Sequence, residues 1–398
     1  MKMILILSAV VAIAIASQQD AWKSRFNSQM VRMNDKVDGI FKKSSSSSSS
    51  ESIEDKSLIN RFKDALNCTI DPPPTLDELY QFYQWVQKYN KSYYTPENRL
   101  CRTIHVIRHI RQINAHNVLY EQGLVSYKRG LTDFSDYSSE ENYDRLLLKE
   151  APIIEDTLQG STDLPILPPA RDSVDWRNEG LVSPVGSQWK CGSCYAWGGA
   201  VALEGQLRKC KISSESVSIQ LMVDCPNHGV WGCSSGWPYY VFKWQMSGGI
   251  LPASKYPYKD TSGKCNYNKS DVIAYVDTPY KFNFTDVGGN ATFIKQVVSA
   301  TGPVSIIICV DKSLFQYKSG VYTTKNCCNT VKHVVGIVGY GTDPKFGDYW
   351  IIKNSWGTNW GDKGFAKIAR GNNLCITENY VQYASLKDVN GRKCDLMS

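Results

Sequence analysis

The chain has 398 residues, of which 42% are apolar and 21% are charged, and its formal net charge is +7. This length exceeds one compact domain and the composition excludes a fibrous or wholly disordered protein, so we expect two folded units with connecting segments. The basic residues are scattered, with no run of five or more, so we expect no nucleic-acid partner.

Residues 1–16 are typical of a secretory signal peptide. Lys2 precedes an apolar stretch that ends in Ala14-Ile15-Ala16, and small residues two positions apart mark a cleavage site. Since a bilayer span takes about 20 apolar residues, this stretch is too short for a membrane anchor. We therefore expect export through the secretory pathway, to the lysosome or the extracellular space.

The next three segments differ sharply in composition. Residues 17–74 contain a run of seven serines and three consecutive prolines, which predicts a flexible leader. Residues 75–150 are predicted to form a small, mainly helical unit, because apolar residues recur at helical spacing: Leu79, Phe82, Tyr83 and Val86, then Ile104, Ile107, Ile110 and Ile113. Residues 151–169 carry prolines and acidic residues without periodicity, which indicates a linker open to proteolysis.

The remaining segment, residues 170–398, begins helically and later becomes strand-like. Apolar residues recur at helical spacing after Cys194, whereas β-branched residues gather at 304–308, 334–338 and 349–352. A helix first and a sheet later predict an α+β unit with two packed halves.

The cysteines and the Asn-x-Ser/Thr triplets fit an exported protein. Thirteen cysteines imply disulfides, and the odd number leaves at least one thiol without an intramolecular partner. The triplets predict N-glycosylation at Asn67, Asn90, Asn268, Asn283 and Asn290.

Cys194 is the first candidate for chemistry. It opens the predicted helix directly after a Gly-Ser turn, and a helix N-terminus favours the thiolate, which attacks carbonyl groups. Cys191 and Cys194 form a C-x-x-C, which can also bind zinc or act as a redox pair. A second close pair is missing, since Cys225 and Cys233 lie eight apart, so we expect no metal and no cofactor.

A thiolate nucleophile needs a base, and residues 170–398 offer His228 and His333. His228 lies in a polar turn, where a solvated loop histidine is expected. His333 begins a strand-like run 139 residues after Cys194, and we favour it as the base. Asn354, followed by Ser-Trp-Gly, is the candidate to orient this base.

These residues carry a resemblance to a known family. Residues 167–383 resemble papain-like cysteine peptidases of the cathepsin L type, in which Gln188, Cys194, His333 and Asn354 match the active-site pattern in order. The resemblance implies that Cys194 is the nucleophile, that His333 is general base and then acid, and that Asn354 orients it. Gln188 and the backbone N–H of Cys194 would form the oxyanion hole.

The resemblance also implies a fold and a set of neighbours for the site. The expected fold is papain-like, with a helical half and a β-barrel-like half, preceded by a mainly helical inhibitory propeptide. The expected disulfides are Cys191–Cys233, Cys225–Cys265 and Cys327–Cys375, which leaves Cys210, Cys309, Cys328 and Cys394 unassigned. The expected substrate-binding residues are Gly236, Trp237, Pro238, Ile307, Val334 and Tyr380.

Residues 75–150 resemble the inhibitory propeptide of this family, most closely at Gly130-x-Thr132-x-Phe134-x-Asp136. Such a segment would run through the cleft and block it until the linker is cut. The peptidase region departs from the family pattern at Lys332, Ser235 and Val334. A cation at position 332 would disfavour the imidazolium form of His333, and Val334 would make the second subsite shallower.

The resulting interpretation is a cysteine endopeptidase made as an inactive zymogen. It would hydrolyse peptide bonds through a thiolate–imidazolium pair and an acyl-enzyme intermediate, act as a monomer, and have protein and peptide substrates and its own propeptide as partners. Two alternatives stay open. One is a papain-fold protein with lost or weak catalysis that acts by binding, and the other is a disulfide-rich structural module.

Overall fold

The computed structural model describes residues 70–147, 166–282, 291–328, 330 and 332–394. The predictions for the signal peptide, nearly all of the leader, most of the linker, Asn67, Asn283 and Asn290 lie outside these residues. The chain divides into two compact units, residues 1–111 and 112–398. Each unit is described by itself.

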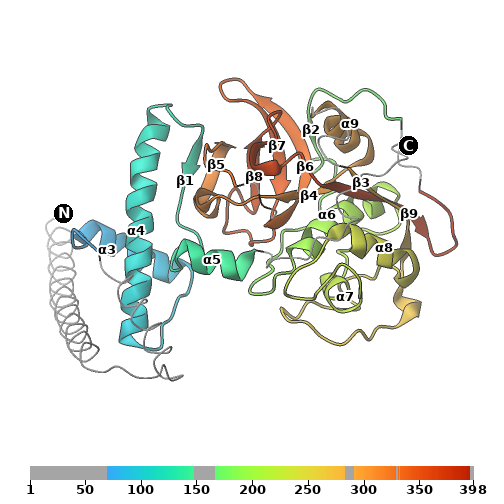
Figure 1. Cartoon of the computed structure of the whole chain (residues 1–398), viewed down its shortest axis with the longest axis horizontal. Helices are drawn as coiled ribbons and strands as arrows, with labels where there is room; N and C mark the ends of the chain where they lie inside the picture. Colours follow the sequence, from blue (N-terminus) through green and yellow to red (C-terminus); the bar gives the residue numbers. More distant parts are fainter. Residues whose placement is uncertain (1–69, 148–165, 283–290, 329, 331, 395–398) are drawn as a thin grey trace, which may run out of the picture. The chain divides into compact units, whose positions relative to one another are not determined.

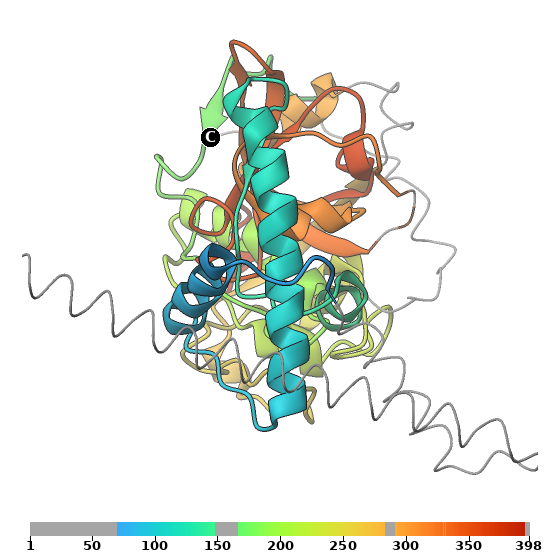
Figure 2. The same cartoon turned by 90° about the vertical axis from the view of Figure 1, so that its left-hand side faces the viewer.

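The first unit contains α3 (Leu76–Lys88) and the larger part of α4 (Pro96–Glu121), a single long helix (Figure 2). A capping box between Thr75 and Glu78 begins α3. Of the apolar residues at helical spacing, Phe82, Ile104, Ile107 and Ile110 are buried, whereas Tyr83 is exposed. The prediction of helices in this region is therefore confirmed.

The second unit starts with the end of α4, a short strand and a short helix. Strand β1 (Tyr127–Arg129) pairs antiparallel with β5 (Tyr317–Tyr322). Helix α5 (Ser139–Leu146) begins with a second capping box, between Ser138 and Glu141. The strand was not expected from the sequence, because three residues form a strand here only through their pairing with a distant segment.

Helices gather in one half of the peptidase region (Figure 1). They are α6 (Cys194–Lys209), α7 (Ile219–Asp224) and α8 (Pro238–Gly248). Helix α6 contacts α7 and α8 on one side and β4, β6 and β9 of the sheet on the other, so its residues are nearly all buried. Cys194, the first residue of α6, is thereby placed between the two halves.

The other half is a sheet with strand order β1-β5-β8-β7-β6-β4-β9-β3, and β2 pairs with β6. The strands are β2 (Val174–Asp175), β3 (Ala274–Phe282), β4 (Val304–Ile308), β6 (His333–Asp343), β7 (Gly347–Lys353), β8 (Phe365–Ala369) and β9 (Val381–Asp388). Helix α9 (Thr292–Thr301) and the short 3-10 helices η2 (Lys269–Asp271), η4 (Lys312–Gln316) and η5 (Leu374–Ile376) complete the described elements. The three predicted strands are confirmed in β4, β6 and β7.

The sheet is open rather than closed. Its path runs from β1 to β3, and these two end strands are not paired with each other. The expected β-barrel-like half is thus a mixed, curved sheet in which β5 and β8 are parallel and the other neighbours are antiparallel.

Disulfides connect the segments of the second unit. Cys191–Cys233, Cys225–Cys265 and Cys327–Cys375 are paired in the structure. Two further bridges, Cys210–Cys394 and Cys309–Cys328, involve the cysteines that the sequence left unassigned. Within the described residues, Cys194 is the free cysteine. No helix in this part of the chain is long and apolar enough to cross a membrane.

Candidate active site

Cys194 lies at the start of α6, where the sequence places it. Ser193, the residue before it, makes no side-chain hydrogen bond to the first turn of the helix. The thiol contacts the backbone N–H groups of Val334 and Tyr195. Because Val334 directly follows His333, this contact brings the two predicted catalytic residues together.

His333 and Asn354 stand at the ends of paired strands. His333 begins β6 and Asn354 follows β7, and the His333 Nε2 to Asn354 Oδ1 distance is 2.7 Å. The His333 ring stacks on Trp356 with 4.8 Å between centroids. With Nε2 engaged by Asn354, Nδ1 has no hydrogen-bond partner in the described structure and is the nitrogen left for the thiol.

Gln188 is oriented by a residue that the sequence analysis did not select, Ser355. The Ser355 hydroxyl donates to Gln188 Oε1 at 2.7 Å, and the Gln188 N–H donates to the Ser355 carbonyl at 2.9 Å. The amide oxygen is therefore turned toward Ser355, and Nε2 donates to the carbonyl oxygens of Leu146 at 3.0 Å and Cys191 at 3.1 Å. The sequence offered one signal for Ser355, which is that it directly follows Asn354.

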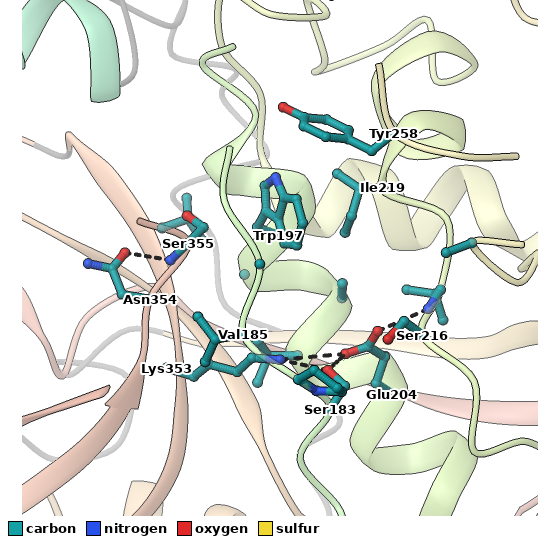
Figure 3. A pocket seen from close by; sticks show the side chains of 18 residues that line it. Ser183, Val185, Trp197, Glu204, Ser216, Ile219, Tyr258, Lys353, Asn354 and Ser355 are labelled. Carbon is teal, nitrogen blue, oxygen red and sulfur yellow. Dashed lines mark hydrogen bonds and ion pairs between the residues drawn. The ribbon is translucent and has the colours of Figure 1, made fainter. Parts of the chain in front are cut away.

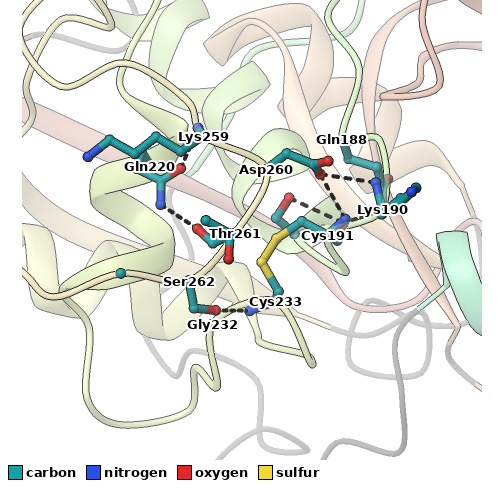
Figure 4. Close-up of a disulfide and its surroundings, with 12 residues drawn as sticks. Gln188, Lys190, Cys191, Gln220, Gly232, Cys233, Lys259, Asp260, Thr261 and Ser262 are labelled. Atoms are coloured by element: carbon teal, nitrogen blue, oxygen red, sulfur yellow. Dashed lines mark hydrogen bonds between the residues drawn. A yellow bond between two sulfur atoms is a disulfide. The ribbon is translucent and has the colours of Figure 1, made fainter.

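A disulfide and an aspartate fix the loop between Gln188 and Cys194 (Figure 4). The Asp260 carboxylate accepts from the backbone N–H groups of Lys190 and Cys191, both at 3.0 Å. Gly192 donates to the Cys233 carbonyl at 2.9 Å, and a Cβ at this position would lie 2.6 Å from that oxygen. Only glycine allows the loop to approach Cys233 this closely.

The predicted substrate-binding residues gather around α6. Ile307 and Val334 are partners across β4 and β6, and the rings of Trp237 and Tyr380 lie 6.2 Å apart. Pro238 begins α8 and Gly236 lies close to the ring of Tyr195.

By contrast, the structure does not bring His228 to the site, because it lies exposed in a turn. Of the glycosylation candidates, Asn90 and Asn268 are exposed.

Residues 126–147 cover this site. The Leu146 carbonyl accepts a hydrogen bond from Gln188 Nε2, and the Tyr143 hydroxyl donates to the Val310 carbonyl at 2.8 Å. Further along, the Thr132 hydroxyl donates to the Phe315 carbonyl at 3.2 Å, and Phe134 packs edge-on against Trp356 at 5.9 Å. The segment thus holds a carbonyl oxygen against Gln188 Nε2, the group that the sequence analysis expected in the oxyanion hole.

Burial controls the protonation of the covered site. It raises the pKa of Cys194 to about 12, although the N–H groups of Val334 and Tyr195 act in the opposite direction. Burial also lowers the pKa of His333 to about 4, opposed by the hydrogen bond to Asn354. Both groups are therefore neutral near pH 7 in this covered form. The thiolate expected at the helix start is outweighed by burial, and burial rather than the Lys332 charge lowers the pKa of His333.

Comparisons with known proteins agree with this geometry. Residues 170–385 match the papain family cysteine protease model, and residues 82–142 match the cathepsin propeptide inhibitor domain. The chain is 35% identical to cathepsin S of Mus musculus over 79% of this chain and 92% of that protein. It is also 35% identical to a cathepsin L-like proteinase of Fasciola hepatica, over 75% of this chain and 90% of that protein.

Solved structures give the same result. The digestive procathepsin L 3 of Tenebrio molitor larval midgut superimposes with a TM-score of 0.68 and 29% identity, covering 78% of this chain and 99% of that one. The chain therefore belongs to the papain family of cysteine proteases and is a cysteine endopeptidase made as a zymogen, with a cathepsin-type inhibitory propeptide.

Proposed function

We propose that Cys194 is the nucleophile of this endopeptidase, that His333 is its general base and acid, and that Asn354 and Gln188 complete the site. The observation that carries the proposal is the arrangement around one free thiol. Cys194 starts a buried helix beside His333, and His333 is held by Asn354 through Nε2. Gln188 Nε2 already binds a peptide carbonyl oxygen at this place.

The reaction follows from these positions. His333 takes the proton of the Cys194 thiol, and the thiolate attacks the carbonyl carbon of the scissile bond. The developing oxyanion is stabilised by Gln188 Nε2 and the backbone N–H of Cys194. His333 then gives its proton to the leaving amine, which leaves a thioester. Water attacks the thioester with His333 as base, and the carboxylic acid and the thiol are released.

The propeptide would keep the enzyme latent until the linker, residues 151–169, is cut. Residues 126–147 bind Gln188 and pack on Trp356, which stacks on His333, and the buried Cys194 and His333 are neutral in this form. We propose that the chain enters the secretory pathway through residues 1–16 and that the mature peptidase, residues 170–398, is a monomer in the lysosome or outside the cell. Disulfides and exposed Asn90 and Asn268 fit this compartment.

Substrate selection would depend on the residues around α6. Trp237, Pro238, Ile307, Val334 and Tyr380 would line an apolar second subsite, and Gly236 would pair with the substrate backbone. Val334 packs close to Gly198, so that a Cβ on Gly198 would lie 2.5 Å from it. This crowding supports a shallow subsite that prefers aliphatic to aromatic side chains, which a peptide-library cleavage profile measures.

The test is labelling of the acid-matured enzyme with a thiol-directed epoxide, together with peptide cleavage between about pH 4 and 7. We expect one equivalent of label on Cys194 and complete loss of cleavage in parallel. Cys194→Ala removes both, whereas His228→Gln, a change in an exposed turn, leaves both unchanged. An unlabelled Cys194 with no cleavage at any pH contradicts the proposal and favours a protein that acts by binding.

A further inference from the structure

A buried polar link joins the two halves of the peptidase unit behind the active site. Lys353 Nζ donates to the Ser183 hydroxyl at 2.6 Å and lies 3.9 Å from Glu204 Oε2. Ser183 in turn donates to the same carboxylate, and the backbone N–H of Val217 donates to Glu204 Oε1 at 2.9 Å. The side chains of Lys353 and Glu204 are each 6% exposed, so this link is shielded from solvent and salt.

The two ends of the link belong to the elements that carry the chemistry. Glu204 lies on α6, whose first residue is Cys194. Lys353 is the last residue of β7, and Asn354 and Ser355 follow it directly. Asn354 holds His333 and Ser355 holds Gln188. One end of the link is thus fixed to the helix of the nucleophile, and the other to the two residues that orient its partners.

Apolar contacts between α6 and the sheet lie next to the link, since Val201 clusters with Val338 and Ile351. A cavity of about 250 Å³ lies beside the link and is lined by Trp197, Ile219, Tyr258, Val334 and both charged residues. Figure 3 shows the Lys353 side chain reaching from the sheet side toward Ser183 and Glu204. Beside this cavity, the hydrogen bonds and the ion pair add a directional connection between α6 and the end of β7.

We propose that Glu204, Ser183 and Lys353 are positioning residues, which set the distance between Cys194 and the His333–Asn354 pair. The inference rests on the proposed roles of those catalytic residues. A displacement on the order of 1 Å at the reacting groups costs up to about a hundredfold in rate. A link that fixes α6 against the end of β7 therefore controls the turnover number more than substrate binding.

A purely structural role predicts a different outcome and can be separated. Removing one partner leaves a buried, uncompensated charge, which destabilises the fold, whereas removing both charges together avoids this penalty. Besides burial, the positive charge of Arg208 lowers the pKa of Lys353, and Arg208 is kept in all variants. Stability and turnover therefore respond differently to the double substitution if the link positions the site.

The experiment compares matured wild type with Glu204→Gln, Lys353→Met and the double variant Glu204→Gln/Lys353→Met, which keeps an acceptor for the Val217 N–H. We measure kcat, KM, Tm and the pH profile of Cys194 alkylation by iodoacetamide. We expect kcat to fall about tenfold to a hundredfold in each, with KM unchanged and the alkylation profile shifted. The double variant regains the wild-type Tm but not kcat. A double variant that regains kcat together with Tm overturns the inference, as do single variants with normal kcat.

Two further variants keep the test decisive. Ser183→Ala removes only the bridging hydroxyl, leaves both charges, and lowers kcat about fivefold; unchanged kcat in this variant contradicts the inference even if the charge variants do not fold. Arg370→Met is the matched control, because Arg370 pairs with Asp348 at the opposite end of β7, and we expect a lower Tm with normal kcat. Inactive wild type would instead refute the proposed function itself.

Discussion

The helical half and the sheet half of the peptidase unit contribute to the site in different ways. The helical half supplies Cys194, and its loops are fixed by the Cys191–Cys233 and Cys225–Cys265 bridges. The sheet half supplies His333 and Asn354, and most of the described contacts of residues 126–147 also fall on it, at β5, Val310, Phe315 and Trp356. The helical half therefore serves catalysis, whereas the sheet half serves both catalysis and the binding of the inhibitory segment.

The double task of the sheet half has a physical basis in one aromatic cluster. Trp356 stacks on the His333 ring and on Phe315, with 5.1 Å between the Trp356 and Phe315 centroids. The propeptide rings of Phe134 and Tyr143 pack edge-on against Trp356 and Phe315. The residues that support the base are therefore also the residues that receive the inhibitor, so changes in this half couple catalysis to latency.

The largest expected effect is the acid opening of the precursor through His333. The pKa of His333 is lowered from 6.5 to about 4 in the covered form. An uncovered form with an ordinary pKa binds more protons between these values, so the covered form is fully favoured above about pH 6.5. It loses on the order of 3 kcal/mol as the pH falls to about 4.

The inactive Cys194→Ala precursor separates this opening from cleavage. Hydrogen exchange of residues 126–147, measured against pH, reports the opening. We expect His333→Gln in this background to shift opening to lower pH, and His228→Gln, in the helical half, to leave it unchanged. Equal opening curves for the parent and the His333→Gln precursor would contradict the coupling.

A second change should affect catalysis without affecting latency. Asn354 contacts His333, and among the described contacts of residues 126–147 it receives none. Asn354→Ala removes the orienting acceptor, and we expect kcat/KM to fall about a hundredfold, on the order of 3 kcal/mol. Stopped assays on matured enzyme measure this loss, while hydrogen exchange of residues 126–147 in the precursor at about pH 7, where His333 is neutral, should stay at the wild-type rate. Faster exchange at this pH would mean that the two tasks cannot be separated even here.

A smaller, opposite effect is expected from Phe134. Phe134→Ala removes its edge-on contact with Trp356 and part of its buried area, a loss of about 1–2 kcal/mol. The precursor should then mature about tenfold faster at a fixed mildly acidic pH, with unchanged kcat after maturation. Leu124→Ala, a substitution at an exposed residue just before this segment, is the control and should mature at the wild-type rate.

The smallest effect is expected for the ion pair between Lys312 and Glu140, whose atoms lie 2.7 Å apart on the surface. Lys312 lowers the pKa of Glu140, so the pair contributes above the ordinary pKa of a glutamate and is lost as the pH falls through the lowered value. Lys312→Ala should weaken latency by less than about 1 kcal/mol. This prediction is checked by maturation rates measured with and without about 0.5 M salt, because salt should reduce the difference between variant and wild type.

Sequence reasoning works best where chemistry is local. Gln188 and Cys194 lie six positions apart in one motif, and His333 was one of two histidines to choose from, so these positions could be predicted. Ser355 and Asp260 could not, because their roles depend on which distant loop comes to lie beside Gln188. The Glu204–Lys353 link has the same origin, since its partners lie on different halves.

Two other features needed the three-dimensional structure for physical reasons. A neighbouring charge at Lys332 was expected to control His333, but burial of the ring has the larger effect. Four unassigned cysteines allow three pairings, and only the packing of the C-terminal residues on the end of α6 brings Cys210 to Cys394.

The adjacent cysteines Cys327 and Cys328 carry a consequence for making this protein. Each reaches a different partner, Cys375 and Cys309, and the Cys309 N–H donates to the Cys375 carbonyl at 2.9 Å. All four sulfurs therefore meet at one corner of the sheet, where early oxidation can trap a wrong pair. Production of active enzyme requires an oxidising medium with a thiol–disulfide shuffling buffer or an isomerase, and a reducing cytosol is the wrong host compartment.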